Sequence, residues 1–455
     1  MIEINDKIFK AYDIRGVYGE DFDDELAYRL GRSFAELLKS ETGRETVNLG
    51  VARDMRLSSE NLYQRLIDGI LEQGVNVIEF GLLSTPTFYF GVAKNRLDGG
   101  IQVSASHNPP QYNGFKLVRA GANSVSSETG IMTLKQAVEK NEFPFVANKG
   151  YRAGKMDNLI DEQVDFALQN VNFRKIKPYK IIVDSANAMG GPLIKALFDR
   201  LPVEVEYLNF ELDGSFPAHE ADPLKDKNNK QLQQKVIESG ADFGVALDGD
   251  GDRIFFIDNQ GKTVEPAIVR GILAKIFLQE NPGATICYDI RPGKITEDMI
   301  LQYGGKPVVT RVGHSLIKEK AREVGAVFAG ESSGHYFVKT PFGFFEEPLT
   351  VVIKFLLELS ASNLSLSAYI KPLQRYFHSG EINFGVKDKQ LVFNTLKEKY
   401  GDHLQYDFDG LSFTFDDWWF NVRASNTEDV MRLNLEAKNQ VILDEKIEEI
   451  QQLMA

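Results

Sequence analysis

Three stretches of the chain repeat one pattern of hydrophobic and polar positions. In each stretch a short apolar run ends in aspartate, small and polar residues follow, and a helix-like segment leads to a second apolar run. Short strand–helix–strand units of this kind predict parallel strands joined by right-handed crossovers. The expected strand, helix and strand lie at 47–51, 59–73 and 75–80, at 181–184, 192–199 and 203–208, and at 285–288, 296–303 and 307–312.

The residues from 368 onward follow a different pattern. Short alternating runs at 381–384, 412–415, 419–422 and 431–436 predict strands, and helices are expected at 389–399 and 444–453. This combination is typical of a small antiparallel α+β domain. The expected fold is therefore three related α/β domains with mixed sheets and a C-terminal α+β domain, with boundaries at 1–150, 151–258, 259–367 and 368–455.

Composition narrows the class of protein. Of the 455 residues 43% are hydrophobic, which argues against disorder as the dominant state. The formal net charge of −13 argues against broad nucleic-acid binding, although a local Arg/Lys cluster can still hold a small anion. The single cysteine, Cys287, excludes an intrachain disulfide framework and a cysteine-rich metal site, and we expect it to be a buried residue of a strand.

No membrane segment is expected. The residues after Met1 contain no apolar run typical of a signal peptide. The most apolar stretch, 349–359, is interrupted by Lys354 and Glu358 and is expected to be a core helix rather than a spanning one. These features favour the cytoplasm as the compartment.

The sharpest chemical motif is the acidic loop Asp248-Gly249-Asp250-Gly251-Asp252-Arg253, which lies between two strand-like runs. Three carboxylates at alternate positions, separated by glycines, can converge on one divalent cation if the loop turns tightly. An EF-hand is excluded by spacing, because its sixth position would be Arg253 and its twelfth Asn259. The remaining alternative is a solvated acidic turn.

A second motif is Ser104-Ala105-Ser106-His107-Asn108-Pro109-Pro110, which follows a strand-like run. A serine beside a histidine, on a loop made rigid by two prolines, has the exposure that a nucleophile needs. Ser106 and His107 are therefore candidates, with an ordinary Asn-Pro turn as the alternative. Lys116, a few residues further on, is a candidate proton donor, and its alternative is a surface lysine.

The motif Gly330-Glu331-Ser332-Ser333-Gly334-His335 matches the G-x-S-x-G pattern of hydrolases. A hydrolase elbow requires a helix after the motif, whereas the residues 336–341 are typical of a strand, so we reject that interpretation. Glu331, Ser333 and His335 instead offer alternating polar groups that suit sugar hydroxyls.

Near the C-terminus, Arg423-Ala424-Ser425-Asn426-Thr427-Glu428 and Arg432 form a possible phosphate clamp, with a Ser/Asn helix cap as the alternative. Arg15 and His314 are weaker candidates, and a lone histidine such as His314 is more often a buried imidazole with its partners satisfied. Neither a P-loop nor a G-x-G-x-x-G motif after a strand is present, so the sequence supports neither ATP nor NAD binding.

Taken together, these four motifs resemble those of the α-D-phosphohexomutase family, most closely its phosphomannomutase/phosphoglucomutase members. The resemblance spans the whole chain and has the motifs in the family's order. It implies four domains arranged around a central active-site cleft. It also implies a reaction that moves phosphate between O6 and O1 of a hexose, through a phosphoserine and a hexose 1,6-bisphosphate, which also serves as activator.

The resemblance also implies residue roles. Ser106 carries the phosphoryl group, and Asp248, Asp250, Asp252 and a phosphoserine oxygen hold Mg²⁺. Mg²⁺, together with Arg253 or His107, offsets the phosphoryl charge. The candidates for proton transfer and charge stabilisation are Lys116, Arg15 and His335. The candidates for binding the substrate are His314, Glu331, Ser333, Arg423, Ser425, Asn426, Thr427 and Arg432.

Two positions depart from the family pattern. Asp429 stands where proline often follows the Thr-Glu of the phosphate loop, and Ser332 occupies a position whose identity tracks the preferred sugar. The expected substrate is a small phosphosugar of mannose or glucose. Phosphoglucosamine mutase is the alternative within the family, and a phosphosugar-binding protein without catalysis, or a phosphatase, is the alternative outside it. A monomer and a homodimer both remain open.

Overall fold

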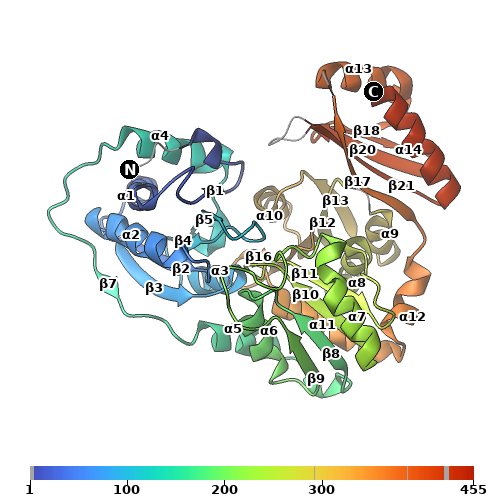
Figure 1. The fold of residues 1–455 in the computed structure, drawn as a ribbon, viewed down its shortest axis with the longest axis horizontal. Coiled ribbons are helices and arrows are strands. Elements are labelled where there is room, and N and C mark those ends of the chain that lie inside the picture. The colour runs from blue at the N-terminus through green and yellow to red at the C-terminus, as the bar shows by residue number, and fades with distance from the viewer. Residues whose placement is uncertain (1–4, 292, 387, 425–429, 455) are drawn as a thin grey trace. The chain divides into compact units, whose positions relative to one another are not determined.

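The structure is a computed structural model that describes residues 5–291, 293–386, 388–424 and 430–454 (Figure 1). The chain divides into two compact units, each with its own core. Unit 1 comprises Met1–Val264 and Ser333–Ser367, and unit 2 comprises Glu265–Ser332 and Ala368–Ala455.

The first sheet of unit 1 has the strand order β1-β5-β4-β2-β3-β7, with β6 paired to β5. The central strands β2, β3 and β4 are parallel, whereas β5 is antiparallel to β4, so the sheet is mixed. Its strands are Ile14–Val17 (β1), Asn48–Arg53 (β2), Asn76–Leu82 (β3), Gly99–Val103 (β4), Tyr112–Arg119 (β5), Asn123–Ser124 (β6) and Arg152–Ala153 (β7).

Helices cover both faces of this sheet, as the blue and cyan ribbons of Figure 1 show. One face is covered by α1 and α2, whose apolar residues, such as Phe34 and Leu66, are buried against β2 and β4. The other face is covered by α3 and α5, where Phe88 and Leu159 lie in one core cluster. The helices are Asp24–Thr42 (α1), Ser59–Glu72 (α2), Thr85–Lys94 (α3), Met132–Lys140 (α4) and Leu159–Leu168 (α5).

The second sheet of unit 1 has the order β11-β10-β8-β9, in which β8, β9 and β10 are parallel and β11 is antiparallel to β10. A hairpin of β15 and β16 and the long helix α11 complete the unit. The bounds are Lys180–Asp184 (β8), Gly190–Phe198 (α6), Glu204–Leu208 (β9), Lys230–Ser239 (α7), Phe243–Leu247 (β10), Ile254–Asp258 (β11), Tyr336–Lys339 (β15), Phe344–Glu346 (β16) and Pro348–Ser362 (α11).

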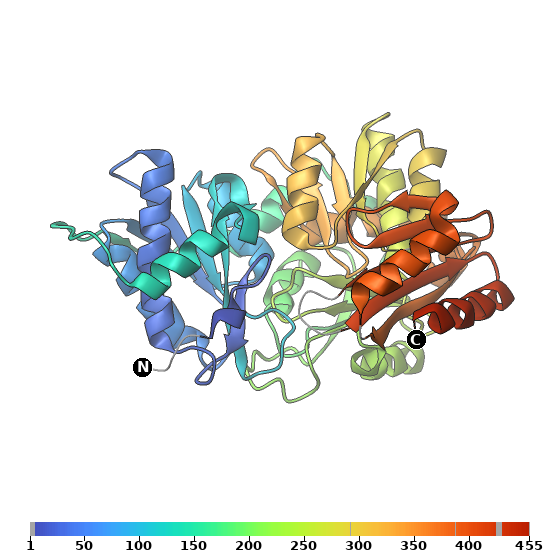
Figure 2. The ribbon, with the colours of Figure 1, turned by 90° about the horizontal axis from the view of Figure 1, so that it is seen from above.

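Unit 2 begins with the parallel strands β13-β12-β14 and the helices α8, α9 and α10. It ends with an antiparallel sheet of order β17-β21-β20-β19-β18, one face of which packs against α13 and α14 (Figure 2). The bounds are Pro266–Glu280 (α8), Thr285–Asp289 (β12), Lys294–Gln302 (α9), Lys306–Thr310 (β13), His314–Glu323 (α10), Phe328–Gly330 (β14), Leu366–Ile370 (α12), Phe377–Gly385 (β17), Lys389–Tyr400 (α13), Leu404–Tyr406 (β18), Leu411–Thr414 (β19), Trp418–Ala424 (β20), Val430–Ala437 (β21) and Gln440–Met454 (α14).

The elements predicted from the repeated pattern are all present, with ends that differ by a few residues. The three parallel trios β3-β2-β4, β9-β8-β10 and β13-β12-β14 have the same strand order, which confirms the repeat and its parallel pairing. The antiparallel C-terminal sheet is confirmed too, although its edge strand β18 was not predicted. Cys287 is fully buried in β12, as expected.

The apolar stretch 349–359 lies within α11, most of whose apolar side chains are buried in the core, as predicted. Among the described residues, no single helix has the length and apolar character needed to cross a membrane. One pair of helical segments, Pro348–Ser362 and Leu366–Leu373, meets those criteria only when taken together, and the pair is bent by 87°.

Candidate active site

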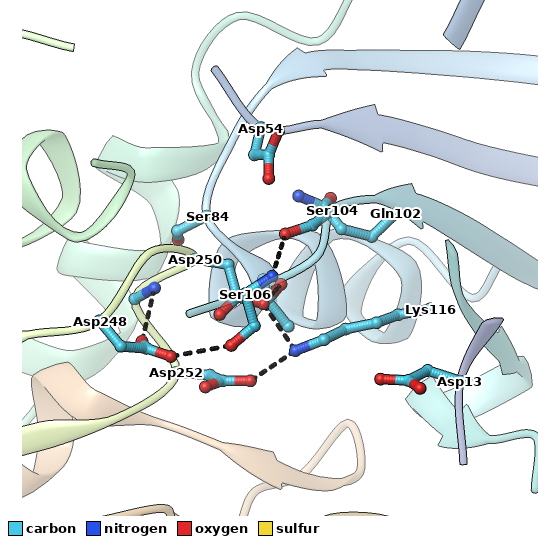
Figure 3. A network of polar contacts seen from close by, with 12 residues as sticks. Asp13, Asp54, Ser84, Gln102, Ser104, Ser106, Lys116, Asp248, Asp250 and Asp252 are labelled. Carbon is cyan, nitrogen blue, oxygen red and sulfur yellow. Dashed lines mark hydrogen bonds and ion pairs between the residues drawn. The ribbon is translucent and has the colours of Figure 1, made fainter. Parts of the chain in front are cut away.

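The loop that carries Ser106 connects β4 to β5 in unit 1 (Figure 3). Ser106 has a positive φ of 50°, and its backbone N–H donates a 3.0 Å hydrogen bond to the hydroxyl of Ser104. Its own hydroxyl donates to Oδ2 of Asp248 at 2.9 Å and lies 3.2 Å from Nδ1 of His107. The turn therefore directs the Ser106 hydroxyl toward the acidic loop.

The acidic loop joins the antiparallel strands β10 and β11, so apolar strands flank it as the sequence predicted. Oδ1 of Asp248 accepts the backbone N–H groups of Gly251 at 3.1 Å and Arg253 at 3.2 Å, which closes the turn. A Cβ on Gly249 would lie 2.2 Å from the carbonyl oxygen of Ser106, so only glycine permits the two loops to approach this closely.

The three aspartates of the acidic loop are fully buried, which excludes the solvated acidic turn. Oxygen atoms from Asp248, Asp250 and Asp252 lie within 4.8 Å of one another. Burial, together with the charges of Asp252 and Asp250, raises the pKa of Asp248 well above its usual range. Oδ1 of Asp250 is also buried and accepts no hydrogen bond from any described residue. This set of oxygen ligands fits a hard divalent cation.

Lys116 extends from β5 to the same cluster, where Nζ lies 2.6 Å from Oδ2 of both Asp250 and Asp252. Burial alone would lower the pKa of Lys116, but the charges of the two aspartates outweigh it and raise that pKa well above its usual value. Lys116 is therefore a buried counter-charge, and the alternative of a surface lysine is wrong.

Arg15 contacts the Ser106 loop, and His107 belongs to that loop. Nη1 of Arg15 donates a 2.6 Å hydrogen bond to Oδ1 of Asn108. Burial opposes its charge, yet Asp13 and Asp250 raise the pKa of Arg15 above its usual value. Burial, and then the positive charges of Arg253 and Arg15, hold the pKa of His107 well below its usual range, so His107 is neutral near pH 7.

The end of the predicted sugar loop belongs to unit 1 and contacts the acidic loop. The N–H of Ile254 donates to the carbonyl of Gly334 at 3.1 Å, and Arg253 and His335 form a β-bridge. Nε2 of His335 lies 3.1 Å from Oδ1 of Asp252, while its Nδ1 lies 3.0 Å from the hydroxyl of Ser333. The structure thus brings His335, Ser333 and Arg253 to the three aspartates. It also confirms that a strand, β15, follows this motif instead of a helix.

In unit 2, Glu331 follows β14 and lies close to the start of α10. Its Oε1 accepts the N–H of Gly313 at 2.9 Å, which places the carboxylate next to the residue that precedes His314. A guanidinium nitrogen of Arg291 lies 3.9 Å from the same oxygen. The candidates Glu331 and His314 therefore belong to one cluster.

The candidates Arg423 and Arg432 lie directly opposite each other on β20 and β21. Both guanidiniums pair with Glu381 of β17, at 3.0 Å and 3.3 Å respectively. Burial opposes ionisation of Glu381, but the two arginines lower its pKa below the usual value. The remaining candidates of this loop, Ser425, Asn426 and Thr427, and the departure Asp429, lie outside the described residues.

Several residues of the site were not found from the sequence. Thr85 donates a hydrogen bond of 2.6 Å to Oδ2 of Asp250, and Arg56 contacts the backbone of the Ser106 loop. The helix-start signature Ser84-Thr85-Pro86 and the position of Arg56 just after a strand-end aspartate were available signals. Neither signal identifies a partner, because both partners are distant in the sequence.

The comparisons with known proteins agree with this geometry. Four family models, described as phosphoglucomutase/phosphomannomutase alpha/beta/alpha domains I, II and III and the C-terminal domain, match residues 6–145, 161–261, 266–376 and 381–453. The chain belongs to the phosphoglucomutase/phosphomannomutase family.

Relatives of this family cover nearly the whole chain. A phosphomannomutase of Vibrio cholerae is 39% identical over 457 residues, which is 98% of both chains. A phosphomannomutase of Methanocaldococcus jannaschii is 37% identical and covers 98% of this chain and 97% of its own. The crystal structure of a phosphoglucomutase/phosphomannomutase family protein from Burkholderia thailandensis has a TM-score of 0.89 and 32% identity, over 99% of this chain and 97% of that one.

Family membership confirms the resemblance found in the motifs and the predicted fold class, with α/β domains of mixed sheets and a distinct C-terminal domain. The protein is a phosphohexomutase, an isomerase of carbohydrate metabolism that acts on small phosphosugars. Its acidic cluster could hold a metal ion.

Proposed function

We propose that the protein interconverts the 6-phosphate and 1-phosphate of mannose or glucose, through a phosphoserine at position 106 and a hexose 1,6-bisphosphate. The observation that carries the proposal is the 2.9 Å hydrogen bond between the Ser106 hydroxyl and the carboxylate of Asp248, inside a buried cluster of three aspartates. A nucleophile, charge-stabilising groups and a set of cation ligands meet there, as phosphoryl transfer requires.

The reaction consists of two transfers. In the first, a sugar hydroxyl attacks the phosphorus of phosphoserine, the bond from phosphorus to Oγ of Ser106 breaks, and the sugar becomes a bisphosphate. In the second, Oγ of Ser106 attacks the phosphorus of the other phosphate of the turned-over bisphosphate, the bond from that phosphorus to its sugar oxygen breaks, and the sugar keeps the phosphate that it received in the first transfer. The bisphosphate is then both intermediate and activator, because it can phosphorylate an enzyme that has lost its phosphoryl group.

Asp248, Asp250 and Asp252, with an oxygen of the phosphorylated Ser106, would hold the cation, which we propose is Mg²⁺. The fit rests on the buried Oδ1 of Asp250, which accepts no hydrogen bond from the described residues, and on the all-oxygen ligand set. When bound, such a cation neutralises charge on the transferring phosphoryl group.

The surroundings of each candidate for proton transfer indicate which role it has. Lys116 and Arg15 have raised pKa values and are assigned to charge stabilisation. Neutral His107, 3.2 Å from Oγ of Ser106, is suited to exchange a proton with that oxygen. His335, between Asp252 and Ser333, is assigned to the proton of the reacting sugar hydroxyl. Arg253 offsets phosphoryl charge.

The candidates for substrate binding keep the roles expected from the sequence. Glu331, with Ser333 and His314, would bind ring hydroxyls that both orientations of the sugar present. Arg423 and Arg432 would grip the phosphate that is not reacting, together with Ser425, Asn426 and Thr427. Support for mannose comes from relatives at 37–39% identity that are named phosphomannomutase.

Three further features belong to this proposal. The domain boundaries remain those predicted from the sequence, at 150, 258 and 367. The compartment is the cytoplasm, which agrees with a chain whose single cysteine forms no disulfide. The enzyme acts as a monomer or a homodimer.

A substrate panel tests the function. Mannose, glucose, glucosamine and N-acetylglucosamine 1-phosphates are each supplied with a trace of the matching 1,6-bisphosphate, and turnover is followed. Mannose or glucose should be fastest, and faster turnover of glucosamine 1-phosphate would establish the alternative mutase. The intact mass of the protein should exceed the mass of the unmodified chain by about 80 Da, because Ser106 carries a phosphoryl group. Ser106→Ala should abolish turnover and leave sugar-phosphate binding measurable, whereas near-wild-type turnover would refute the role of Ser106.

The metal is tested separately. Chelation should abolish turnover and Mg²⁺ should restore it, and Asp250→Asn should reduce turnover more than it reduces the thermal midpoint of unfolding. Turnover that survives exhaustive chelation would exclude the metal from the proposal.

A further inference from the structure

Arg56 is a buried arginine that the proposed reaction does not use. Its guanidinium donates four hydrogen bonds, all to backbone carbonyls of the segment around Ser106. Nη2 contacts the carbonyls of Ser106 at 2.7 Å and Asn108 at 2.6 Å. Nη1 contacts those of Pro109 at 2.8 Å and Tyr112 at 2.9 Å. One side chain therefore satisfies four backbone carbonyls of this segment.

The guanidinium is itself held in place. Nε of Arg56 lies 3.2 Å from Oδ2 of Asp54, the aspartate at the end of the first repeated strand. Oδ1 of Asp54 accepts the N–H of Arg56 at 3.0 Å and the hydroxyl of Ser59 at 2.5 Å. The ring of Phe216 lies 5.0 Å from the guanidinium carbon. These contacts fix the position and the plane of the fork.

One of the carbonyls that Arg56 holds belongs to Ser106, whose backbone conformation is unusual. Ser106 has φ of 50°, a conformation that costs a serine free energy and persists only where its surroundings enforce it. The carbonyl of Ser106 is held by Arg56 on one side and lies against Gly249 on the other. Arg56 thus stabilises the turn that directs the serine hydroxyl toward Asp248.

Unit 2 contains a related arrangement, in which the aspartate itself contacts the loop. Asp289 ends the third repeated strand, β12, and its carboxylate accepts the N–H of Ser332 at 3.1 Å and the hydroxyl of Ser332 at 2.8 Å. Arg270 also pairs with Asp289, at 2.7 Å. In both repeats the strand-end aspartate acts on the loop that follows the neighbouring parallel strand. The first and third of the recurring aspartates, Asp54 and Asp289, therefore both help to hold a loop of the site.

We propose that Asp54 and Arg56 are positioning residues, which hold the Ser106 loop in the geometry for phosphoryl transfer without touching the phosphoryl group or the sugar. The inference rests on the proposed function, because it assumes that Ser106 is the phosphorylated residue. It predicts that loss of the guanidinium fork affects the transfer step far more than sugar binding.

The experiment compares Arg56→Lys and Arg56→Gln with Arg65→Gln, a control that removes a half-exposed arginine paired with Asp68 in the same domain. Each full-length variant is phosphorylated with glucose 1,6-bisphosphate. Three quantities are measured: kcat, the Kd of glucose 1-phosphate, and the partition of phosphoserine between transfer to glucose 1-phosphate and hydrolysis. The thermal midpoint reports on folding.

In Arg56→Gln we expect kcat to fall about a hundredfold, whereas the Kd of glucose 1-phosphate should stay within about threefold of the wild-type value. A larger share of the phosphoserine should be lost to hydrolysis. Arg56→Lys should recover only part of kcat, because an ammonium cannot reproduce the fork. The control should match the wild type. If Arg56→Gln does not fold, the same measurements are made on Arg56→Lys and Asp54→Asn.

A folded Arg56 variant with wild-type kcat and partition overturns the inference. So does a loss of kcat matched by an equal loss of sugar-phosphate affinity, which indicates general damage to the fold. Failure of the proposed function has a different signature, since the wild-type protein itself would then form no phosphoserine from the bisphosphate.

Discussion

The hydroxyl of Thr85 donates a 2.6 Å hydrogen bond to Oδ2 of Asp250, and the backbone N–H of Thr85 donates to the carbonyl of Asp250 at 2.9 Å. Thr85 is the first residue of α3, so the start of a helix in the first domain holds a carboxylate of the acidic loop. Lys116 donates to the same oxygen. Oδ2 is therefore occupied twice, which leaves Oδ1 for a cation.

Thr85→Val should weaken cation binding. The substitution keeps the shape of the side chain but removes the donor, so Asp250 is less firmly oriented and metal affinity should fall by between about 10- and 100-fold. Binding of Mn²⁺ to the purified protein, followed by its paramagnetic resonance signal, measures this directly. Thr85→Ser restores the hydroxyl and should bind nearly as well as the wild type. Equal affinities in the valine and serine variants would contradict the role of this hydrogen bond.

Lys116→Met should make the stability of the protein depend on the cation. The fully buried Asp250 and Asp252 lose their shared counter-charge, and removal of one partner from a buried ion pair costs about 3–5 kcal/mol. Because Mg²⁺ can replace part of that charge, the thermal midpoint should be lowest in chelator and should rise with added Mg²⁺.

The matched control is Lys94→Met, which removes a half-exposed lysine paired with Glu162 at 2.6 Å. Surface pairs contribute at most about 1 kcal/mol, so this variant should show little loss and the same response to Mg²⁺ as the wild type. A Lys116 variant that behaves like this control would refute the counter-charge role.

Local patterns were sufficient to predict the elements and loops that carry the chemistry. The alternation of aspartate and glycine at 248–252, between two strand-like runs, indicated a loop whose carboxylates converge if it turns tightly, and the structure has such a turn between β10 and β11. The apolar runs ending in Asp54, Asp184 and Asp289 predicted the three parallel units. Each of these signals spans only a few residues, and over that length periodicity and turn chemistry determine the local structure.

The partners of those loops could not be predicted in the same way. Arg56 and Ser106 are 50 positions apart, and Thr85 and Asp250 are 165 apart. Such contacts arise from the strand order, which brings the carboxyl ends of β2 and β4 together, and from the packing of α3. Lys116 illustrates the limit, because a lysine near a turn is usually exposed and only the three-dimensional structure shows its two buried carboxylates.

Gly249→Ala should separate the two loops. The added Cβ would lie 2.2 Å from the carbonyl oxygen of Ser106, so either loop must move, and a displacement of about 1 Å at a reacting group can cost 100-fold in rate. Turnover should fall steeply while the thermal midpoint changes less. Gly154→Ala is the control, since a Cβ there meets no atom within 4 Å. Wild-type turnover in Gly249→Ala would show that the close approach is dispensable.

Glu347 should give the stability of unit 1 a distinct dependence on pH. The residue precedes α11, is fully buried and accepts hydrogen bonds from Nε2 of Gln163 at 3.0 Å and 3.3 Å. Burial raises the pKa of Glu347 from 4.5 to about 8, although the bonds from Gln163 and from backbone N–H groups oppose the shift. The folded state therefore binds this proton more tightly than the unfolded state does.

The sign of the effect follows from that difference. The stabilisation is fully present below pH 4.5, decreases as the pH rises, and is lost once the pH passes about 8. Over this window one proton corresponds to a slope of about 1.4 kcal/mol per pH unit. Glu347→Gln keeps the size and a hydrogen-bonding oxygen but cannot ionise, so the variant should gain stability relative to the wild type as the pH rises from 5 to 8.

Thermal midpoints measured across that range test the prediction, with Glu142→Gln as the control because Glu142 is exposed on the loop after α4. The difference between Glu347→Gln and the wild type should grow with pH, whereas the difference for the control should stay constant. Parallel curves for all three proteins would mean that Glu347 does not change protonation on folding. The comparison with the wild type is necessary because Glu436, whose pKa burial raises to about 7, contributes a trend of the same sign to every variant.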